Sequence, residues 1–396
     1  MFPYLICMSL GAMMAGMLNS LRRYFAAAIA PVFLNVILVG VLAWAWYNGI
    51  GEAAVGTALA WGVLAAGLVQ LAIVWIAVRH AGVRIGFRRP RFTPNVRRLL
   101  WLALPAAITG GITQINTLIG TAIASGQDRA VSSLNLADRV YQLPLGVVGV
   151  AVAIVLLPEL ARALKAGNLE EASNLQNRSV EFTLFLTLPA AAALLVISEP
   201  IVRVLYERGA FTPQDTGVVS GILAIFGLGL PAFVLIKAFT PGYFAREDTR
   251  TPMMFAALSV AVNVGLALTL FPSMGGAGIA TASAVAGWVN AALLLGVLIR
   301  RGQWSRDAGL IRRGPRMLLA AALMGAALWG AMQWFGEHLS SSAPFYEQAA
   351  VLAAMVAGAM VVSFGVVFAI GAADLRTIGR SVKRGQAAPA RPVDDE

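Results

Sequence analysis

Apolar runs of about twenty residues recur along the whole sequence, and each is long enough to cross the hydrocarbon core of a bilayer as a helix. The chain is 59% hydrophobic and 12% charged, which is more apolar surface than a soluble domain of 396 residues buries. We therefore predict an all-α, polytopic membrane protein of about eleven spans. Charged and Gly/Pro-rich breaks place these spans near residues 2–18, 25–47, 53–78, 99–125, 130–160, 180–204, 216–245, 252–272, 276–299, 316–336 and 348–371.

The basic residues are distributed unevenly between the two sides of the predicted membrane. Apart from Arg129, Arg139, Arg203, Arg208 and Lys237, all of the 30 Lys and Arg residues lie on alternate connections or in the tail. This positive-inside asymmetry predicts a cytoplasmic C-terminus and an outer position for the first residue. We expect the net charge of +11 to face anionic membrane lipids, with no role for nucleic acid.

Residue types that carry catalysis or bind metals are sparse. Cys7 is the only cysteine, and His80 and His338 are far apart in the sequence. No Ser/His/Asp set and no Gly-rich phosphate loop is present. The first apolar segment lacks a positive n-region, so it is interpreted as a span and not as a signal peptide. We expect no enzymatic activity, no metal site and no cofactor.

A weak internal repeat relates the first three predicted spans to the seventh, eighth and ninth. An offset of 228 residues pairs Pro3 with Pro231 and Asn35 with Asn263. Repeated halves are common in transporters, which bind their substrate between two lobes. The repeat predicts that three further spans precede Met1; the alternative is a complete protein with chance similarities. The predicted parts are an incomplete N-lobe (1–79), a basic amphipathic cytoplasmic linker (80–98), a C-lobe (99–300), a helix pair (301–372) and a disordered cytoplasmic tail (373–396).

The predicted span at 130–160 carries one polar face. Ser132, Asn135, Arg139 and Gln142 recur at steps of three and four residues, followed by Gly146 and Gly149. By helical rise Arg139 lies about 16 Å from the outer end of the span, which is mid-membrane. A charge at that depth costs roughly 2.5–3.5 kcal/mol and is usually found at a polar cavity or beside an opposite charge.

Two interpretations of Arg139 follow from this depth. In the first, the guanidinium binds a phosphate group through two parallel hydrogen bonds. In the second, it forms a structural ion pair with a carboxylate on another helix. Asp138 lies about 100° further around the helix and does not neutralise Arg139 along one face, which favours the first interpretation.

Other polar residues in predicted spans leave alternatives open. Lys237 lies between Pro231 and Pro241, and it either snorkels to the cytoplasmic surface or faces a cavity. The polar residues of the span at 99–125, including Asn116, favour hydrogen bonds between helices. The charged group at the outer end of the sixth span is predicted to anchor it at the interface; it comprises Arg203, Glu207 and Arg208.

Three stretches of the sequence carry specific motifs. They are Phe2-Pro3-Tyr4 through Leu18-Asn19 to Pro31 and Leu34-Asn35, Ala137-Asp138-Arg139 with Leu143-Pro144-Leu145-Gly146 and Leu156-Leu157-Pro158, and Lys237 through Pro241-Gly242-Tyr243 to Thr251-Pro252. These stretches resemble the lipid II flippase (MurJ/MviN) family, within the multidrug/oligosaccharidyl-lipid/polysaccharide exporter superfamily. The resemblance covers nearly the whole chain, and it implies spans four to fourteen of a fourteen-span, two-lobed fold whose last helix pair lines a groove for a lipid tail.

The resemblance implies a transport function in bacterial cell wall biogenesis. The substrate would be lipid II, the undecaprenyl-diphosphate-linked disaccharide-pentapeptide, moved by alternating access from the cytoplasmic to the periplasmic leaflet of the inner membrane. Arg139 matches the essential arginine of the family, and Ser132 falls at a cavity-lining position. The predicted substrate-binding residues are Arg139, Ser132, Asn135, Gln142, Asp138 and Lys237.

Two departures from the family pattern give further expectations. The sodium site of some members would use Asn263, but Ala267 stands where a carboxylate is expected, which argues against sodium coupling. Essential residues of the family's first two spans have no counterpart in the sequence. The alternatives are therefore a related exporter of other lipid-linked oligosaccharides or drugs, or a truncated and inactive remnant.

Overall fold

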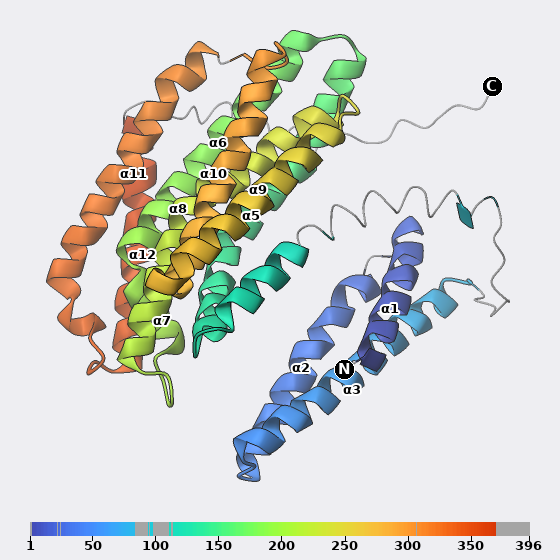
Figure 1. Ribbon diagram of the computed structural model, residues 1–396, viewed down its shortest axis with the longest axis vertical. Helices are drawn as coiled ribbons and strands as arrows, with labels where there is room; N and C mark the ends of the chain where they lie inside the picture. Colours follow the sequence, from blue (N-terminus) through green and yellow to red (C-terminus); the bar gives the residue numbers. More distant parts are fainter. Residues whose placement is uncertain are drawn as a thin grey trace. The chain divides into compact units, whose positions relative to one another are not determined.

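The computed structural model describes residues 2–21, 23, 25–83, 94, 96–97, 111, 114–305 and 307–369. Every regular element among them is a helix, which confirms the all-α fold class (Figure 1). The chain divides into two compact units at residues 97 and 98. Most of the predicted linker at 80–98, and the whole predicted tail at 373–396, lie outside the described residues.

Unit 1 contains three helices, α1 (Phe2–Ser20), α2 (Phe25–Tyr47) and α3 (Glu52–His80). Helix α3 packs against both α1 and α2, whereas α1 and α2 make few contacts with each other. A Cβ atom at Gly67 would lie 2.6 Å from the ring of Tyr4, so glycine permits the close crossing of α1 and α3. Only Ala30 and Ala45 of α2 are buried, which suits an apolar helix that contacts lipid.

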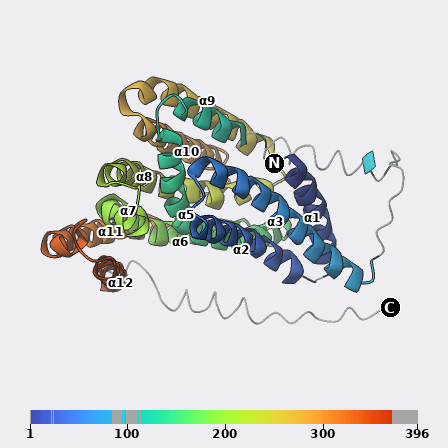
Figure 2. The same ribbon diagram turned by 90° about the horizontal axis from the view of Figure 1, so that it is seen from below.

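Unit 2 is built around α8 (Pro213–Phe244), which is the most buried of the apolar helices and packs against α5, α6 and α10. Helices α11 and α12 lie together at one edge of this unit (Figure 2). Its core joins Val140 and Tyr141 of α5 to Ile222, Leu230 and Val234 of α8. The remaining elements are α5 (Ala130–Lys165), α6 (Leu169–Val196), α7 (Ser198–Tyr206), α9 (Arg250–Met274), α10 (Gly276–Arg300), α11 (Ala308–Phe335), η1 (Glu337–Leu339) and α12 (Phe345–Ala369).

Helices α8, α9 and α10 repeat the packing order of unit 1. Helix α10 packs against both α8 and α9, whereas α8 and α9 barely touch. The third helix of each triplet thus packs against the other two. Gly275 joins α9 to α10 with φ of +56°, a left-handed conformation that glycine adopts readily.

Eight described helices are long and apolar enough to cross a membrane, namely α2, α3, α6 and α8 to α12. The other predicted spans correspond to the shorter apolar helix α1, to α5, and to residues 99–125, of which 114–124 are described and helical. The predicted span at 180–204 is not continuous, because α6 ends at Val196 and α7 begins at Ser198. Pro200 has no N–H to bond the carbonyl of Val196, which accounts for the break.

Candidate functional site

Helices α5 and α8 run side by side and parallel, and this pairing positions the candidate site. At the N-terminal ends of the two helices Arg129 forms an ion pair with Asp215 at 3.0 Å. Further along, the rings of Tyr141 and Phe226 lie 5.3 Å apart. Further still, the side chain of Lys237 lies against Gly149. These contacts advance by about 20 residues on each helix, so the two helices stay in register over about 30 Å.

Helix α5 has one exposed polar face and one buried apolar face, as its three- and four-residue spacing predicts. The side chains of Ser132, Asn135, Arg139 and Gln142 are exposed, whereas Ala137 and the core residues of α5 are buried. The hydroxyl of Ser132 donates to the Arg129 carbonyl at 2.8 Å, and the amide of Asn135 donates to the Val131 carbonyl at 2.8 Å. The polar face is therefore held in place from within α5 itself.

Arg139 has no hydrogen-bond or ion-pair partner within the described part of the chain. Asp138 accepts a short hydrogen bond from the Gln142 amide and does not bond the guanidinium. Tyr206 of α7 donates to the Leu136 carbonyl at 3.3 Å. Its phenol lies close enough to Arg139 for the two groups to interact electrostatically. The ion-pair interpretation of Arg139 thus finds no carboxylate among the described residues.

Lys237 lies between two prolines of α8, and its half-buried side chain points to α5. A Cβ atom at Gly149 would lie 2.6 Å from Cδ and 2.7 Å from Nζ of Lys237. The contact exists because Gly149 has no side chain.

Asn263 forms a second polar cluster, between helices that are distant in sequence. Its amide nitrogen donates to the Asn116 side-chain oxygen at 2.8 Å, and Ser283 donates to its oxygen at 3.3 Å. Asn116 thus makes the interhelical hydrogen bond that its position in a span suggests. Ala267, one turn from Asn263, is buried. These neutral side chains bond one another, and no carboxylate takes part in these hydrogen bonds.

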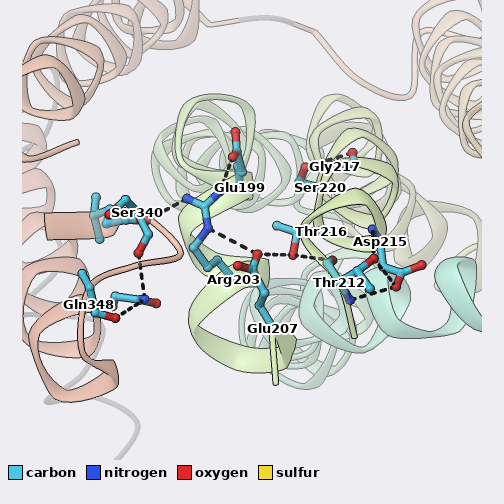
Figure 3. Close-up of polar contacts among 12 residues, drawn as sticks. Glu199, Arg203, Glu207, Thr212, Asp215, Thr216, Gly217, Ser220, Ser340 and Gln348 are labelled. Atoms are coloured by element: carbon cyan, nitrogen blue, oxygen red, sulfur yellow. Dashed lines mark hydrogen bonds and ion pairs between the residues drawn. The ribbon is translucent and has the colours of Figure 1, made fainter. Parts of the chain in front are cut away.

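At the end of unit 2 that carries α7, Arg203 joins three segments of the chain (Figure 3). Its guanidinium donates to Glu199 at 2.5 Å and to Glu207 at 3.3 Å. It also donates to the carbonyl of Leu339 at 2.7 Å, across the loop between α11 and α12. The Arg203 side chain is 15% exposed, so α7 is tied to this loop by a largely buried cation.

The network continues from Glu207 to the start of α8 (Figure 3). Thr216 donates to the Glu207 carboxylate at 2.5 Å. One turn earlier, Thr212 and Asp215 form a capping box, in which each side chain accepts from the other's backbone N–H. Asp215 also pairs with Arg129, so the network ends at the start of α5.

The sequence interpretation assigned Arg203, Glu207 and Arg208 to simple interfacial anchoring. The structure shows that Arg203 and Glu207 belong to a network between helices, while Arg208 lies 4.0 Å from the ring centre of Phe345. Two sequence signals were available for the network. They are the four-residue spacing of the charges in α7 and the Thr-x-x-Asp pattern before α8.

The C-terminal ends of α8 and α10 and the start of α9 are joined by the segment after Pro241. Tyr243 donates to the Leu294 carbonyl at 2.6 Å, and Arg246 donates to the Gln303 carbonyl at 2.9 Å. Asp248 accepts from Thr251 and forms an ion pair with Arg301 at 2.6 Å. Side-chain and backbone hydrogen bonds from Thr251, together with Arg301, lower the pKa of Asp248 to about 2.

An apolar cavity of about 310 Å³ opens between α11 and α12. Aliphatic and aromatic side chains form its walls, and Gly358 leaves room at its centre. The lining residues are Ala327, Leu328, Ala331, Phe335, Val351, Ala354, Met355, Gly358, Ala359 and Val362. This surface is suited to a hydrocarbon chain.

These features define a polytopic membrane transporter: many apolar helices, repeated helix triplets, and a polar helix face with an arginine that has no partner among the described residues. Comparisons with known proteins narrow this class. Residues 1–347 match the family model described as lipid II flippase MurJ. The chain belongs to the lipid II flippase MurJ family.

Similar proteins agree with this assignment. The chain is 71% identical over 388 residues to the probable lipid II flippase MurJ of Rhizobium meliloti (strain 1021), covering 98% of this chain and 72% of that protein. It is 31% identical over 381 residues to the lipid II flippase MurJ of Burkholderia cenocepacia, covering 94% of this chain and 72% of that protein. A solved structure of lipid II flippase MurJ in an inward closed conformation has the same fold, with a TM-score of 0.73 at 23% identity over 93% of this chain and 73% of that one.

Proposed function

We propose that this chain moves lipid II from the cytoplasmic to the periplasmic leaflet of the bacterial inner membrane. Membership of the MurJ family supports the substrate, and the unpaired Arg139 on the exposed face of α5 is the observation that carries the site. Such transport breaks no bond in the substrate, so it requires positioning and not catalysis.

In this proposal Arg139 binds the diphosphate of lipid II. A guanidinium presents two parallel N–H donors, which match two oxygens of a phosphate, and it stays charged in an apolar setting. Because Arg139 has no carboxylate partner among the described residues, its donors remain available to a ligand. Ser132, Asn135 and Gln142 extend the polar face on either side, and Asp138 orients Gln142.

The polyprenyl chain of lipid II is assigned to the apolar cavity between α11 and α12. Hydrocarbon gains little by leaving lipid for an apolar cavity, so we expect this surface to guide the tail and contribute little affinity. The ends of α5 and α8 that carry Arg162, Lys165 and Arg246 are assigned to the cytoplasmic side by the positive-inside rule, which also places the C-terminus there.

A complementation experiment tests the proposal. The wild-type chain and the variants Arg139→Ala and Arg139→Lys are expressed in a bacterium depleted of its own lipid II flippase. Arg139→Ala should fail to support growth although the protein inserts, and Arg139→Lys should restore little because an ammonium lacks the bidentate geometry. Arg162→Ala is the matched control, because Arg162 is an exposed arginine at the other end of α5 and should be dispensable. Growth on Arg139→Ala equal to that on wild type would contradict the proposed role of Arg139.

A further inference from the structure

Lys237 is a cation without a partner in an apolar helix. Its ammonium makes no hydrogen bond or ion pair with any residue that the structure describes, and the side chain is half-buried. An ammonium inside a membrane is costly without a partner, so intramembrane lysines generally face a partner, water or a substrate. The side chain lies along α5 at Gly149, not toward the end of α8.

Gly149 is buried and lies about 80° around α5 from the exposed Arg139, between the polar face and the face that packs against α8. It continues the three- and four-residue steps that run through Arg139, Gln142 and Gly146. Ten residues separate Gly149 from Arg139, which is about 15 Å along the helix axis. A diphosphate is too short to reach both cations, so Lys237 and Arg139 would contact it one after the other.

We infer that Lys237 is a second anion-binding group, which holds the diphosphate of the substrate nearer the basic end of α5 before it reaches Arg139. The inference rests on the proposed function, and it assigns Lys237 to loading from the cytoplasmic leaflet. Gly149 is the residue that makes this position possible, because any side chain there would occupy the space of the ammonium.

The local chemistry of α8 suits a group that engages a passing ligand. Pro241 has no N–H to bond the carbonyl of Lys237, so this turn of α8 lacks one helical hydrogen bond. Pro231 removes the equivalent bond to the carbonyl of Gly227, about three turns earlier. A helix weakened on both sides of Lys237 bends there more readily than elsewhere.

Three variants separate the charge of Lys237 from its packing. Lys237→Met keeps the length of the side chain and removes the charge. Gly149→Ala keeps the charge and displaces it, because the new Cβ would lie 2.7 Å from Nζ. Gly146→Ala is the matched control, because a Cβ at Gly146 on the same face of α5 meets nothing within 4 Å.

The experiment measures transport of fluorescent lipid II by the full chain in proteoliposomes. We expect Lys237→Met and Gly149→Ala to raise the half-saturating lipid II concentration at least about tenfold, the effect of losing one charge-assisted hydrogen bond, with a smaller change in maximal rate. Gly146→Ala should behave as wild type. Undecaprenyl diphosphate should compete about tenfold less well in Lys237→Met than in wild type.

Thermal stability distinguishes ligand binding from a structural role. Removing a half-buried charge that has no described partner should leave the melting temperature of Lys237→Met equal to or above that of wild type. The inference is overturned if Lys237→Met loads lipid II as wild type does, if undecaprenyl diphosphate competes equally in both, or if the variant loses transport together with stability. If the wild-type protein moves no lipid II under these conditions, the proposed function itself fails.

Discussion

The network around Arg203 predicts a measurable stability loss when its central cation is removed. In Arg203→Met the carbonyl of Leu339 loses its donor, and the Glu207 carboxylate loses the one ion-pair partner that it has among the described residues. The side chains of Arg203 and Glu207 are both shielded from solvent, with 15% and 9% of their surfaces exposed. Breaking a fully buried pair costs about 3–5 kcal/mol. Because Thr216 still donates to Glu207, we expect a loss of about 2–3 kcal/mol in the free energy of unfolding.

A double-mutant cycle measures this interaction directly. Arg203→Met, Glu207→Gln and the double variant are unfolded reversibly in mixed detergent micelles, followed by tryptophan fluorescence. The coupling energy between the two residues should be about 1–2 kcal/mol. Arg208→Met is the control, because its contact with the ring of Phe345 is worth about 1 kcal/mol or less at an exposed position. A loss in Arg203→Met no larger than in Arg208→Met would refute the reasoning.

The same network gives a pH dependence with a defined sign. Burial by itself would raise the pKa of Glu207, but hydrogen bonds from Ser341 and Thr216 and the charge of Arg203 hold it below its ordinary value of 4.5. Because the pKa of Glu207 is lower in the folded protein than in the unfolded chain, the ionised carboxylate stabilises the fold at pH values above 4.5. This stabilisation is lost as the pH falls through the lowered pKa of the folded state. Glu207→Gln should therefore flatten the acid limb of the stability profile.

Two further predictions concern Asp248 and the apolar cavity between α11 and α12. Asp248→Asn should cost about 1 kcal/mol at neutral pH after solvent screening, and the difference from wild type should vanish as the pH falls from about 4 toward 2, as measured by unfolding at each pH. Gly358→Phe should fill the cavity between α11 and α12, so it should slow transport of lipid II more than transport of a short-chain analogue. Gly365→Phe is the control, because Gly365 lies on the same helix outside the cavity; this variant should affect the transport of both substrates equally.

The sequence by itself determined the features that depend on local spacing. Twenty-residue apolar runs identify helices because a single segment in a bilayer satisfies its backbone hydrogen bonds within itself only as a helix, and about twenty residues are the length that a spanning helix needs. The polar face through Ser132, Asn135, Arg139 and Gln142 follows from the helical period alone, and the structure exposes these residues as expected. The motifs around Arg139 and Pro241 sufficed to recognise the family that the comparisons then established. The function of this face remains a prediction.

Only the tertiary structure decided which of these helices meet, and in what register. No spacing in the sequence brings Lys237 to Gly149, Asn263 to Asn116, or Arg203 to the Leu339 carbonyl, because the partners are separated by long stretches of chain. Register between helices is fixed by side-chain packing, such as Tyr141 on Phe226, and not by the period of either helix. The break at Ile197 likewise shows that apolar composition marks a span but does not tell whether its helix is continuous.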